Sequence, residues 1–467
     1  MLQRACGNFT SSKRSEDRKK TQQINTIMRM SLVVGILPES KNIWERRTPL
    51  RPEDVAWLIK KNIQVEVATS NLRIYNDSQY KRAGAKIVSK FQKAKLLLGI
   101  KEPPIETLIP ETIYMVFSHT TKGQKYNRKL LAAFLKKKIT LIDYEHIIGS
   151  LGQRLVYFGR FAGICGMVDT LHVFGLKQKL QGNPNPFSEV NNALYYGNYR
   201  SAKKALDLVA ETIKRKGFNK KLVPLVIGIL GHGNVSRGAQ EMLEHIGAVD
   251  IHPKDIESLV HSRCSHKKTI YKLVFQREEI LRSKKGKNFY FEEYLQHPER
   301  FESNLDTFLP YITILINASY WDSRYPRLLP ENMLRKLSRV NTDFRLSVIG
   351  DLSCDIGGTV QITKRVTTAA EPAYVYDPVS GKITNDLKKS GIAVMAIDNL
   401  PCEFPRESST EFAEQIRDFV YQIAVHGITD VTNHHALPNV IRNAVVTQNG
   451  SLTQKFKYLK KIDNRNS

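Results

Sequence analysis

The sequence predicts an α/β fold with mostly parallel β-sheets. Short apolar segments of strand length alternate with amphipathic segments of helix length, which is the pattern of crossover units. One apolar segment, 225–230, runs into a glycine-rich turn and then a helix, as in dinucleotide-binding folds. The 467 residues are enough for more than one domain of average size.

The first α/β unit begins with an apolar strand over 32–37. A helix is expected from Pro52, because proline suits the first helical position and acidic residues favour the positive end of a helix. A second helix is expected over 127–135. The remaining apolar segments of this unit are expected to be strands, at 65–68, 95–100, 114–117 and 140–143.

A second unit is expected to start near Tyr157. Apolar residues recur at helical spacing over 199–213 and over 412–425, which predicts two helices. Residues 262–300 are highly charged, and we expect an insertion with helical pieces there. The other expected elements are the strands 225–230, 249–251, 312–316, 346–351 and 392–397 and the helix 234–246.

Composition narrows the class of protein. Hydrophobic residues make up 41% of the chain, enough for a real core, and no apolar run approaches the ~18 residues of a membrane-spanning helix. The five scattered cysteines predict no disulfide framework, which favours a reducing compartment. The formal charge of +26 fits nucleic-acid binding or a generally basic surface, and we favour the second because no nucleic-acid motif is present.

Residues 1–30 form a polar, basic segment without the apolar core of a secretory signal. We expect a disordered basic tail, or an overlong start with Met28 or Met30 as the first residue, and a cytoplasmic protein. A mitochondrial transit peptide is the alternative, which Glu16 and Asp17 disfavour.

The clearest local motif is a pair of glycines, Gly231 and Gly233, directly after the apolar strand. Gly231 allows a tight turn, and Gly233 lets the backbone approach a pyrophosphate at the N-terminus of the next helix. Ser236 stands at the third glycine position of the usual pattern, and a glycine follows at Gly238. The alternative is a tight turn in another α/β fold.

The strand after such a motif normally ends in an acid that binds the ribose hydroxyls. Here Asp250 lies within the expected strand and His252 stands at its end. His252 and the nearby Arg237 would tolerate a 2′-phosphate, which favours NADPH over NADH. The alternative is that both side chains are exposed without a role.

Two groups that can move protons follow apolar strands, Lys101 after 95–100 and His119 after 114–117. Ligand sites in open α/β sheets lie beyond the carboxyl ends of the strands. Histidine titrates near neutrality, and lysine does so when burial or neighbouring cations lower its pKa. A structural role for the histidine is the alternative.

Lys41 and Arg47 belong to a basic segment after the first strand. Arginine pairs bidentately with carboxylates, so the segment is a candidate dicarboxylate site, with a solvated basic loop as the alternative. His261, Cys264 and His266 lie close together in the sequence, but no second pair of ligands accompanies them. We expect a surface loop there and no metal.

Several ordered stretches resemble the lysine–2-oxoglutarate reductase family, the saccharopine-forming half of bifunctional aminoadipic semialdehyde synthases, from about Leu32 to about Leu459. More distantly, the pattern is similar to alanine dehydrogenase and the transhydrogenase catalytic subunit. The stretches that carry the resemblance are NIWERRTPL at 42–50, LLGIKEPP at 97–104, FSHT at 117–120, LIDYE at 141–145, FGRFAGICG at 158–166, GHGNVSRGAQ at 231–240, LINASYW at 315–321, DLSCDIGGT at 351–359 and SGIAVMAIDNLP at 390–401.

The resemblance implies site roles. Lys101 and His119 match the family's acid–base pair, and Arg47 matches an arginine that binds a substrate carboxylate. His252 stands where relatives carry an acid, and Pro38 where they often carry a basic residue. The other implied site residues are Lys41, Lys122, Glu145, Arg154 and Phe158 around the substrate, Gly231, Gly233, Asn234 and Val235 at the pyrophosphate, and Ser319, Ile397, Asp398 and Leu400 beside the nicotinamide.

The resemblance also implies an enzyme that condenses lysine with 2-oxoglutarate and reduces the imine to saccharopine with NADPH, or with NADH. It implies two Rossmann-like domains around a central cleft, a substrate domain of residues 31–157 joined by 405–467 and a dinucleotide-binding domain of residues 158–404. No second catalytic half follows Ser467, so we expect saccharopine to be made, or this step to be reversed, without cleavage to glutamate.

Other functions fit the same pattern. They are an NAD-dependent, lysine-forming saccharopine dehydrogenase, a related enzyme like alanine dehydrogenase, and a nucleotide- or nucleic-acid-binding protein on the same fold. The presence of Lys101, His119 and Arg47 together disfavours the last. A homo-oligomer is left open, as is which of Lys101 and His119 serves which proton transfer.

Overall fold

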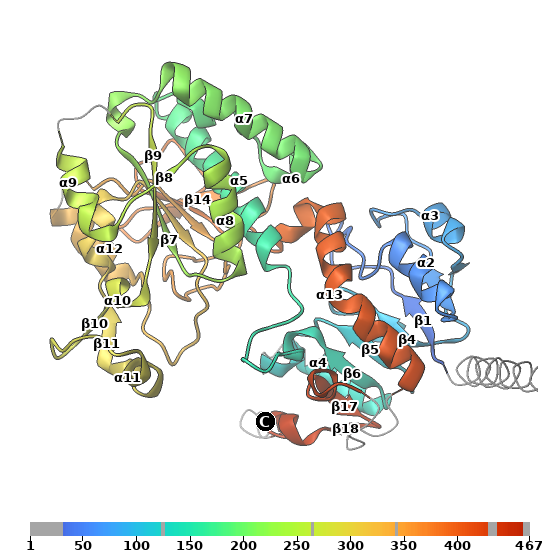
Figure 1. Cartoon of the computed structure of the whole chain (residues 1–467). Helices are drawn as coiled ribbons and strands as arrows, with labels where there is room; N and C mark the ends of the chain where they lie inside the picture. Colours follow the sequence, from blue (N-terminus) through green and yellow to red (C-terminus); the bar gives the residue numbers. More distant parts are fainter. Residues whose placement is uncertain (1–30, 123–126, 263–265, 341–343, 428–436, 461–467) are drawn as a thin grey trace, which may run out of the picture. The chain divides into compact units, whose positions relative to one another are not determined.

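The computed structural model describes residues 31–122, 127–262, 266–340, 344–427 and 437–460. The basic segment 1–30, with its tail or transit-peptide predictions, lies outside the described residues. The chain divides into two compact units, Met1–Tyr157 with Pro405–Ser467 (unit 1) and Phe158–Phe404 (unit 2) (Figure 1). Within the described residues, none of the helices is both long and apolar enough to cross a membrane.

Unit 1 is built on an eight-stranded sheet of order β18-β17-β6-β5-β4-β1-β2-β3. Strands β1 to β6 pair in parallel, and the C-terminal strands β17 and β18 add to one edge in antiparallel fashion. The strands are β1 (Val33–Ile36), β2 (Val65–Ala68), β3 (Lys86–Val88), β4 (Ala94–Leu98), β5 (Ile113–Val116), β6 (Thr140–Asp143), β17 (Val445–Gln448) and β18 (Ser451–Leu452).

Helices complete unit 1. Helix α4 (Arg128–Lys136) packs Leu130 and Phe134 into a core with β4, β5, β6 and β17. Helix α2 (Pro52–Lys60) begins at the predicted proline, and its Trp57 contacts Tyr421 of α13 (Pro405–His426) edge-on, with ring centres 5.6 Å apart. The short helix α3 (Asp77–Arg82) lies between β2 and β3 in the chain.

Unit 2 has its own eight-stranded sheet, of order β15-β14-β16-β13-β12-β7-β9-β8. All neighbours from β16 to β8 are parallel, and β14 and β15 are antiparallel, which confirms the predicted α/β fold. The strands are β7 (Leu225–Leu230), β8 (Val249–Asp250), β9 (Ile270–Phe275), β12 (Ile314–Asn317), β13 (Val348–Asp351), β14 (Ala373–Tyr376), β15 (Ile383–Thr384) and β16 (Ile392–Met395).

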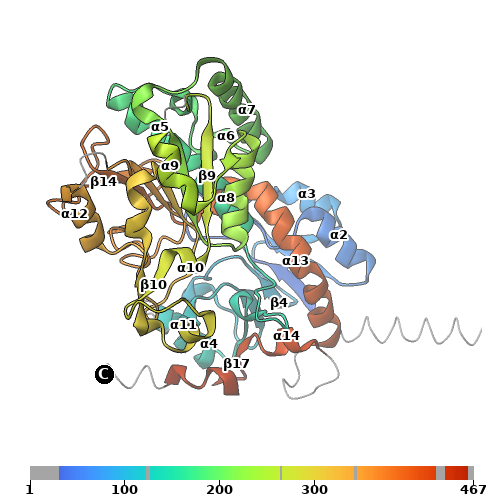
Figure 2. The ribbon, with the colours of Figure 1, turned by 60° about the vertical axis from the view of Figure 1, so that its left-hand side comes forward.

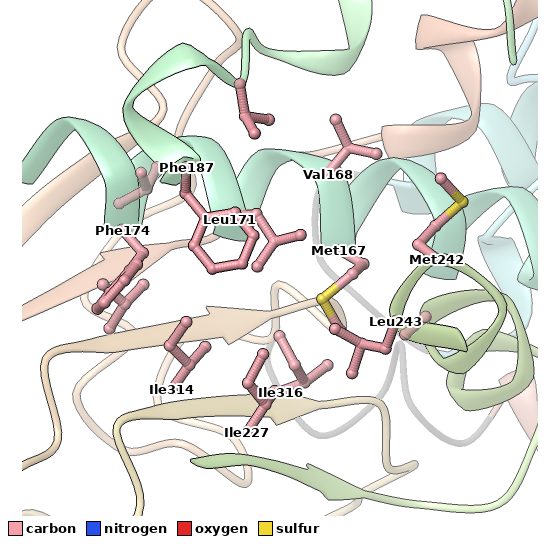
Figure 3. Close-up of a cluster of buried hydrophobic side chains, with 14 of the residues drawn as sticks. Met167, Val168, Leu171, Phe174, Phe187, Ile227, Met242, Leu243, Ile314 and Ile316 are labelled. Atoms are coloured by element: carbon pink, nitrogen blue, oxygen red, sulfur yellow. The ribbon is translucent and has the colours of Figure 1, made fainter. Parts of the chain in front are cut away.

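Alternating strand residues divide the interior of unit 2 into two cores, one on each face of the sheet. Ile227 faces α5 (Gly159–Leu180), α7 (Tyr199–Lys216) and α8 (Asn234–His245), whereas Val226 faces α9 (Ile256–His261) and α12 (Glu331–Val340). Figure 3 shows the first core, with Met167 and Leu171 of α5 above the strands. Figures 1 and 2 both show α5 beside α8.

Helices α5 and α8 approach so closely that glycine is required between them. A Cβ on Gly163 would lie 1.9 Å from the carbonyl oxygen of Val235, and a Cβ on Gly238 would lie 2.0 Å from that of Arg160. Gly238 of the glycine-rich motif therefore serves the contact with α5, a helix that was not predicted from the sequence.

The prediction of an insertion over 262–300 is wrong in one part, because β9 is a strand of the parallel sheet and lies between β7 and β8. The rest of the stretch holds α10 (Arg277–Ile280), α11 (Phe291–Gln296) and β10 (Leu281–Ser283), which pairs with β11 (Phe301–Ser303). Strand β9 was not predicted because Lys272 interrupts its apolar residues. Lys272 is buried, and its Nζ lies 2.9 Å from Glu244 and 3.3 Å from Asp250.

Two buried carboxyl groups, Asp169 of α5 and Glu403 of the turn η11 (Leu400–Glu403), lie close enough to interact with each other. Burial raises the pKa of Asp169 to about 6, and burial together with Asp169 raises the pKa of Glu403 well above its usual value. The folded state thus keeps protons that the unfolded chain has already released. The contribution of this pair to the free energy of unfolding is therefore fully present below the ordinary carboxyl pKa. It is lost as pH rises through 6.

We expect Glu403→Gln to reduce this loss of stability, because glutamine can still donate to Asp169 but does not ionise. One unit of pKa shift corresponds to about 1.4 kcal/mol. Between about pH 5 and pH 8, the unfolding free energy of the variant should therefore improve relative to that of the wild type by at least this amount. Urea unfolding at both pH values measures it, with the exposed Glu211→Gln as control. Parallel pH profiles for Glu403→Gln and the wild type would contradict the expectation.

Candidate active site

Unit 1 gathers charged side chains at one edge of its sheet. The parallel strands β6, β5, β4 and β1 are neighbours in this order, so their carboxyl ends lie at the same edge. The segments that leave these ends carry Lys41, Lys101, Glu102, His119 and Glu145. The two predicted proton-transfer residues thus follow adjacent strands, β4 and β5.

His119 is held by the carboxylate of Glu102. Nδ1 of His119 lies 2.6 Å from Oε1 of Glu102, and each side chain is 19% exposed. Burial opposes ionisation of Glu102, but the hydrogen bond and charge of His119 and the charge of Lys41, whose Nζ is 3.9 Å away, lower its pKa to about 2. The ionised carboxylate accepts the proton on Nδ1, which leaves Nε2 of His119 for proton exchange with a ligand.

The backbone of His119 is strained. Its φ of +49° lies in the left-handed region, which costs a residue other than glycine about 1–3 kcal/mol. Nδ2 of Asn127 donates to the carbonyl of His119 at 3.0 Å and holds this conformation. Such strain is common where a side chain must be aimed at a ligand, which favours a functional histidine over the structural alternative.

Lys101 lies among cations. Burial lowers the pKa of its amine, and the charges of Arg47 and Lys41 lower it further. The carboxylate of Glu39 accepts hydrogen bonds from the backbone N–H groups of Ile100 and Lys101, at 2.5 and 3.1 Å, and so ties the end of β4 to the segment after β1. The site therefore holds a lysine that is neutral at a lower pH than in water.

Arg47 is fully buried. Its Nε and Nη2 donate to the two carboxylate oxygens of Glu45 at 2.7 and 2.5 Å. The alternative of a solvated basic loop is therefore wrong for Arg47, although Ile43 and Trp44 of the same segment are exposed. Its binding of a substrate carboxylate stays a prediction, and the substrate would have to share the guanidinium with Glu45.

A second polar cluster follows β6. The buried Asp143 accepts hydrogen bonds from Oγ of Ser118 at 2.5 Å and from N–H of Glu145 at 2.9 Å, and burial raises its pKa to about 6. Nη2 of Arg154 lies 3.3 Å from Oε1 of Glu145. The predicted residues Glu145 and Arg154 are thus brought together, next to the segment that carries His119.

Two predicted substrate residues are not placed with this group. Phe158 precedes α5 and belongs to unit 2, and the side chain of Lys122 lies outside the described residues. Cys264 of the disfavoured metal site also lies outside them, and both ring nitrogens of His266 bind hydroxyl groups. Across the described ranges, no three His, Cys, Asp or Glu side chains are grouped to hold a metal ion.

Unit 2 carries the glycine-rich turn between β7 and α8, and its geometry fits a dinucleotide. Gly231 has φ +106°, and a Cβ there would lie 2.6 Å from the carbonyl oxygen of Ala318. A Cβ on Gly233 would meet no atom within 4 Å, so the backbone there is open to a ligand. No side chain caps the N-terminus of α8, where Asn234 and Val235 begin the helix and anions bind favourably.

Gly233→Ala separates folding from cofactor binding. We expect an unchanged melting temperature, because the added methyl group has free space, and an affinity for NADPH reduced about 10-fold or more, because the methyl group occupies the approach to the pyrophosphate. Fluorescence titration and thermal unfolding measure the two effects. Gly238→Ala is the contrasting variant and should lose stability by about 1–3 kcal/mol through its clash with α5. Unchanged NADPH affinity in Gly233→Ala would place the pyrophosphate elsewhere.

Ser319 is positioned by a chain of hydrogen bonds at the ends of β12 and β13. Its Oγ donates to Oδ1 of Asn317 at 2.6 Å, and Nδ2 of Asn317 donates to Oδ1 of Asp351 at 2.8 Å. Asp351 also accepts from Ser353 and Thr363, at 2.8 and 2.5 Å. This network gives the shared stretch around Asp351 a role that the sequence did not reveal.

Three of the residues predicted to lie beside the nicotinamide follow β16, and only one of them has an exposed side chain. Ile397 and Leu400 are buried in the core, so only their backbone can meet a cofactor, whereas Asp398 is exposed. His252 follows β8, which β9 separates from β7. The role of His252 at the ribose stays a prediction, and the strand that neighbours β7 on this side of the sheet is β9.

The acids that organise the unit 1 site were not predicted, except for Glu145. Each of these acids stands one or two residues from a predicted site residue; they are Glu39, Glu45, Glu102 and Asp143. The available signal was that Glu102 directly follows Lys101 at a strand end. Which acid pairs with which base depends on the order of the strands in the sheet, and a single sequence does not give this order.

Comparisons with known proteins agree with this architecture. Residues 35–165 match the alanine dehydrogenase/PNT N-terminal domain, and residues 224–455 match the alanine dehydrogenase/PNT C-terminal domain. The match to a solved L-alanine dehydrogenase covers 93% of this chain and 99% of the alanine dehydrogenase chain. The TM-score is 0.60 and the identity is 17%, which shows the same fold.

Two curated relatives share most of this chain. It is 33% identical over 453 residues to an alpha-aminoadipic semialdehyde synthase of Arabidopsis thaliana, covering 93% of this chain and 42% of that protein. The mitochondrial alpha-aminoadipic semialdehyde synthase of Mus musculus is 33% identical over 443 residues, covering 92% and 48%. The chain thus spans less than half the length of these relatives. With both domains matched, the chain belongs to the alanine dehydrogenase/PNT family of nicotinamide-dependent oxidoreductases.

Proposed function

We propose that this chain is an NADPH-dependent reductase that joins L-lysine to 2-oxoglutarate and forms saccharopine. The observation that carries the proposal is the grouping of Lys101, the His119–Glu102 pair and Arg47 around one edge of the unit 1 sheet. The similarity to alpha-aminoadipic semialdehyde synthases supports the choice of substrates.

In the proposed reaction, the ε-amine of lysine attacks the keto carbon of 2-oxoglutarate and loses a proton. The carbinolamine then takes up a proton on its oxygen and loses water, which leaves a protonated imine. NADPH, when bound, supplies the hydride that reduces the imine carbon. Lys101 and Nε2 of His119 take up and return these protons, and the lowered pKa of Lys101 makes its neutral amine available at a lower pH than that of a lysine in water.

The charges of the site suit dicarboxylates. Lys41, Arg47 and Arg154 supply positive charge, and the planar fork of arginine pairs with a carboxylate through two hydrogen bonds. In unit 2, the turn from Gly231 to Val235 would hold the pyrophosphate, and Ser319 and Asp398 would lie beside the nicotinamide.

The test follows the oxidation of NADPH with lysine and 2-oxoglutarate together, with each substrate omitted, and with NADH in place of NADPH. We expect turnover that requires both substrates. Turnover only with pyruvate and ammonia would instead identify an alanine dehydrogenase-like enzyme. Oxidation of saccharopine by NAD, with turnover by NADH but not by NADPH in the reductive direction, would identify the lysine-forming dehydrogenase. Nucleotide binding without any turnover would favour a binding protein.

A further inference from the structure

Strand β7, which runs into the glycine-rich turn, lies between β12 and β9 in the sheet, whereas β8, the next strand in the chain, is not its neighbour. Leu230 at the end of β7 pairs with Phe275 at the end of β9, and β8 lies beyond β9 at the edge. Nε2 of His232, in the glycine-rich turn, donates to the carbonyl of Phe275 at 2.7 Å. The residues after Phe275 therefore leave the sheet directly beside the turn that fits a dinucleotide.

This position decides between the two nicotinamide cofactors in dinucleotide-binding folds. In such folds the adenosine ribose lies near the end of the strand at the position that β9 takes here. An acid at this end binds the hydroxyls of NADH, whereas an arginine accommodates the 2′-phosphate of NADPH. Here Gln276 and Arg277 follow β9, and neither is acidic. His252 lies one strand, about 4.8 Å, further from the turn.

The guanidinium of Arg277 is suited to an anion. It is exposed, and it lies 5.1 Å from the centre of the Phe291 ring, which orders it. Within the described ranges, no carboxylate is in ion-pair distance of Arg277. The nearby Arg282, by contrast, binds Glu302 and Asp306 at 2.8 and 3.0 Å.

The acids nearest to Arg277 in the chain are Glu278 and Glu279. Oε2 of Glu279 accepts a hydrogen bond from N–H of Gln276 at 2.6 Å, and its Oε1 lies 3.9 Å from Nε2 of His252. Glu279 is thus engaged in its own turn. Glu278 is exposed, and it is the acid that would bind ribose hydroxyls if the cofactor were NADH.

We propose that Arg277 binds the 2′-phosphate of NADP(H) and makes this chain select NADPH over NADH. The inference rests on the nicotinamide cofactor of the proposed function, and it assigns to Arg277 the role that was expected of His252. The planar guanidinium, held on the face of Phe291, offers a phosphate two parallel N–H donors.

The test measures binding of adenosine 2′,5′-bisphosphate and of AMP by calorimetry, in the full chain and its variants. The wild type should bind the bisphosphate at least 10-fold more tightly than AMP. Arg277→Ala should weaken binding of the bisphosphate about 10- to 100-fold, the range expected for a hydrogen bond to a charged group, and leave AMP binding unchanged. Arg277→Lys should lose less, because it keeps the charge but not the fork.

The matched control is Arg215→Ala, which removes the same charge from an exposed position on α7 and should change neither affinity by more than about 2-fold. Equal losses for both probes, or no loss in Arg277→Ala, would overturn the inference. The probes need no amino-acid or keto-acid substrate. A wild type that selects the bisphosphate but does not turn over lysine and 2-oxoglutarate would therefore overturn the proposed function alone.

Discussion

Replacing Lys101 with methionine is expected to lower kcat for the reduction of lysine plus 2-oxoglutarate by about 10²- to 10⁴-fold, the contribution of one positioned acid–base group. Methionine keeps the length and the apolar stem of lysine, so the fold should persist. The loss should appear in kcat rather than in nucleotide binding, because Lys101 belongs to unit 1 and the glycine-rich turn to unit 2.

Lys95→Met is the matched control, since Lys95 lies on the same strand, β4, with an exposed side chain. This variant should keep wild-type kcat. The pH profile adds a second readout. Burial and the neighbouring cations lower the pKa of Lys101, so one limb of the wild-type profile should fall below the usual lysine range and vanish in Lys101→Met. A kcat of Lys101→Met within 10-fold of the wild-type value would show that Lys101 is not an acid–base group of the reaction.

Strands with a short apolar stretch were predictable. Thr140–Asp143, with Leu141 and Ile142 at its centre, and the apolar Leu225–Leu230 were predicted with their observed bounds, because β-strands buried on both faces need little more than a short apolar run. Helix α5 was missed for a physical reason. It is buried on nearly all sides, so it lacks an amphipathic period, and it contains Gly163, Gly166 and Gly175, which usually disfavour helices but here allow close packing.

The site was predictable one residue at a time, but not as pairs. Lys101 and His119 were identified because they follow apolar strands in stretches shared with a known family. The bond between His119 and Glu102 arises because β4 and β5 are neighbours in the sheet. The order of β9 and β8 was also not predictable from the sequence. Because β9 lies between β7 and β8, Arg277 rather than His252 follows the strand next to the glycine-rich turn.

Replacing Arg47 with alanine is expected to destabilise the protein by about 3–5 kcal/mol, because it leaves the carboxylate of Glu45 buried without its bidentate partner. A simple binding test on this variant would therefore mix a folding defect with a lost substrate contact. The double variant Glu45→Ala/Arg47→Ala removes both charges and should recover most of the lost stability, as measured by urea unfolding.

The double variant also separates the two roles of Arg47. If Arg47 binds a substrate carboxylate, the stable double variant should still show a KM for 2-oxoglutarate raised about 10-fold or more, since a hydrogen bond to a charged group contributes about 1.5–3 kcal/mol. The single variant Glu45→Ala, which keeps the guanidinium, should retain a KM near that of the wild type. A double variant with unchanged KM would show that the Glu45–Arg47 pair only shapes the segment after β1. Recognition of 2-oxoglutarate would then fall to Lys41 and Arg154, the other cations of the unit 1 site.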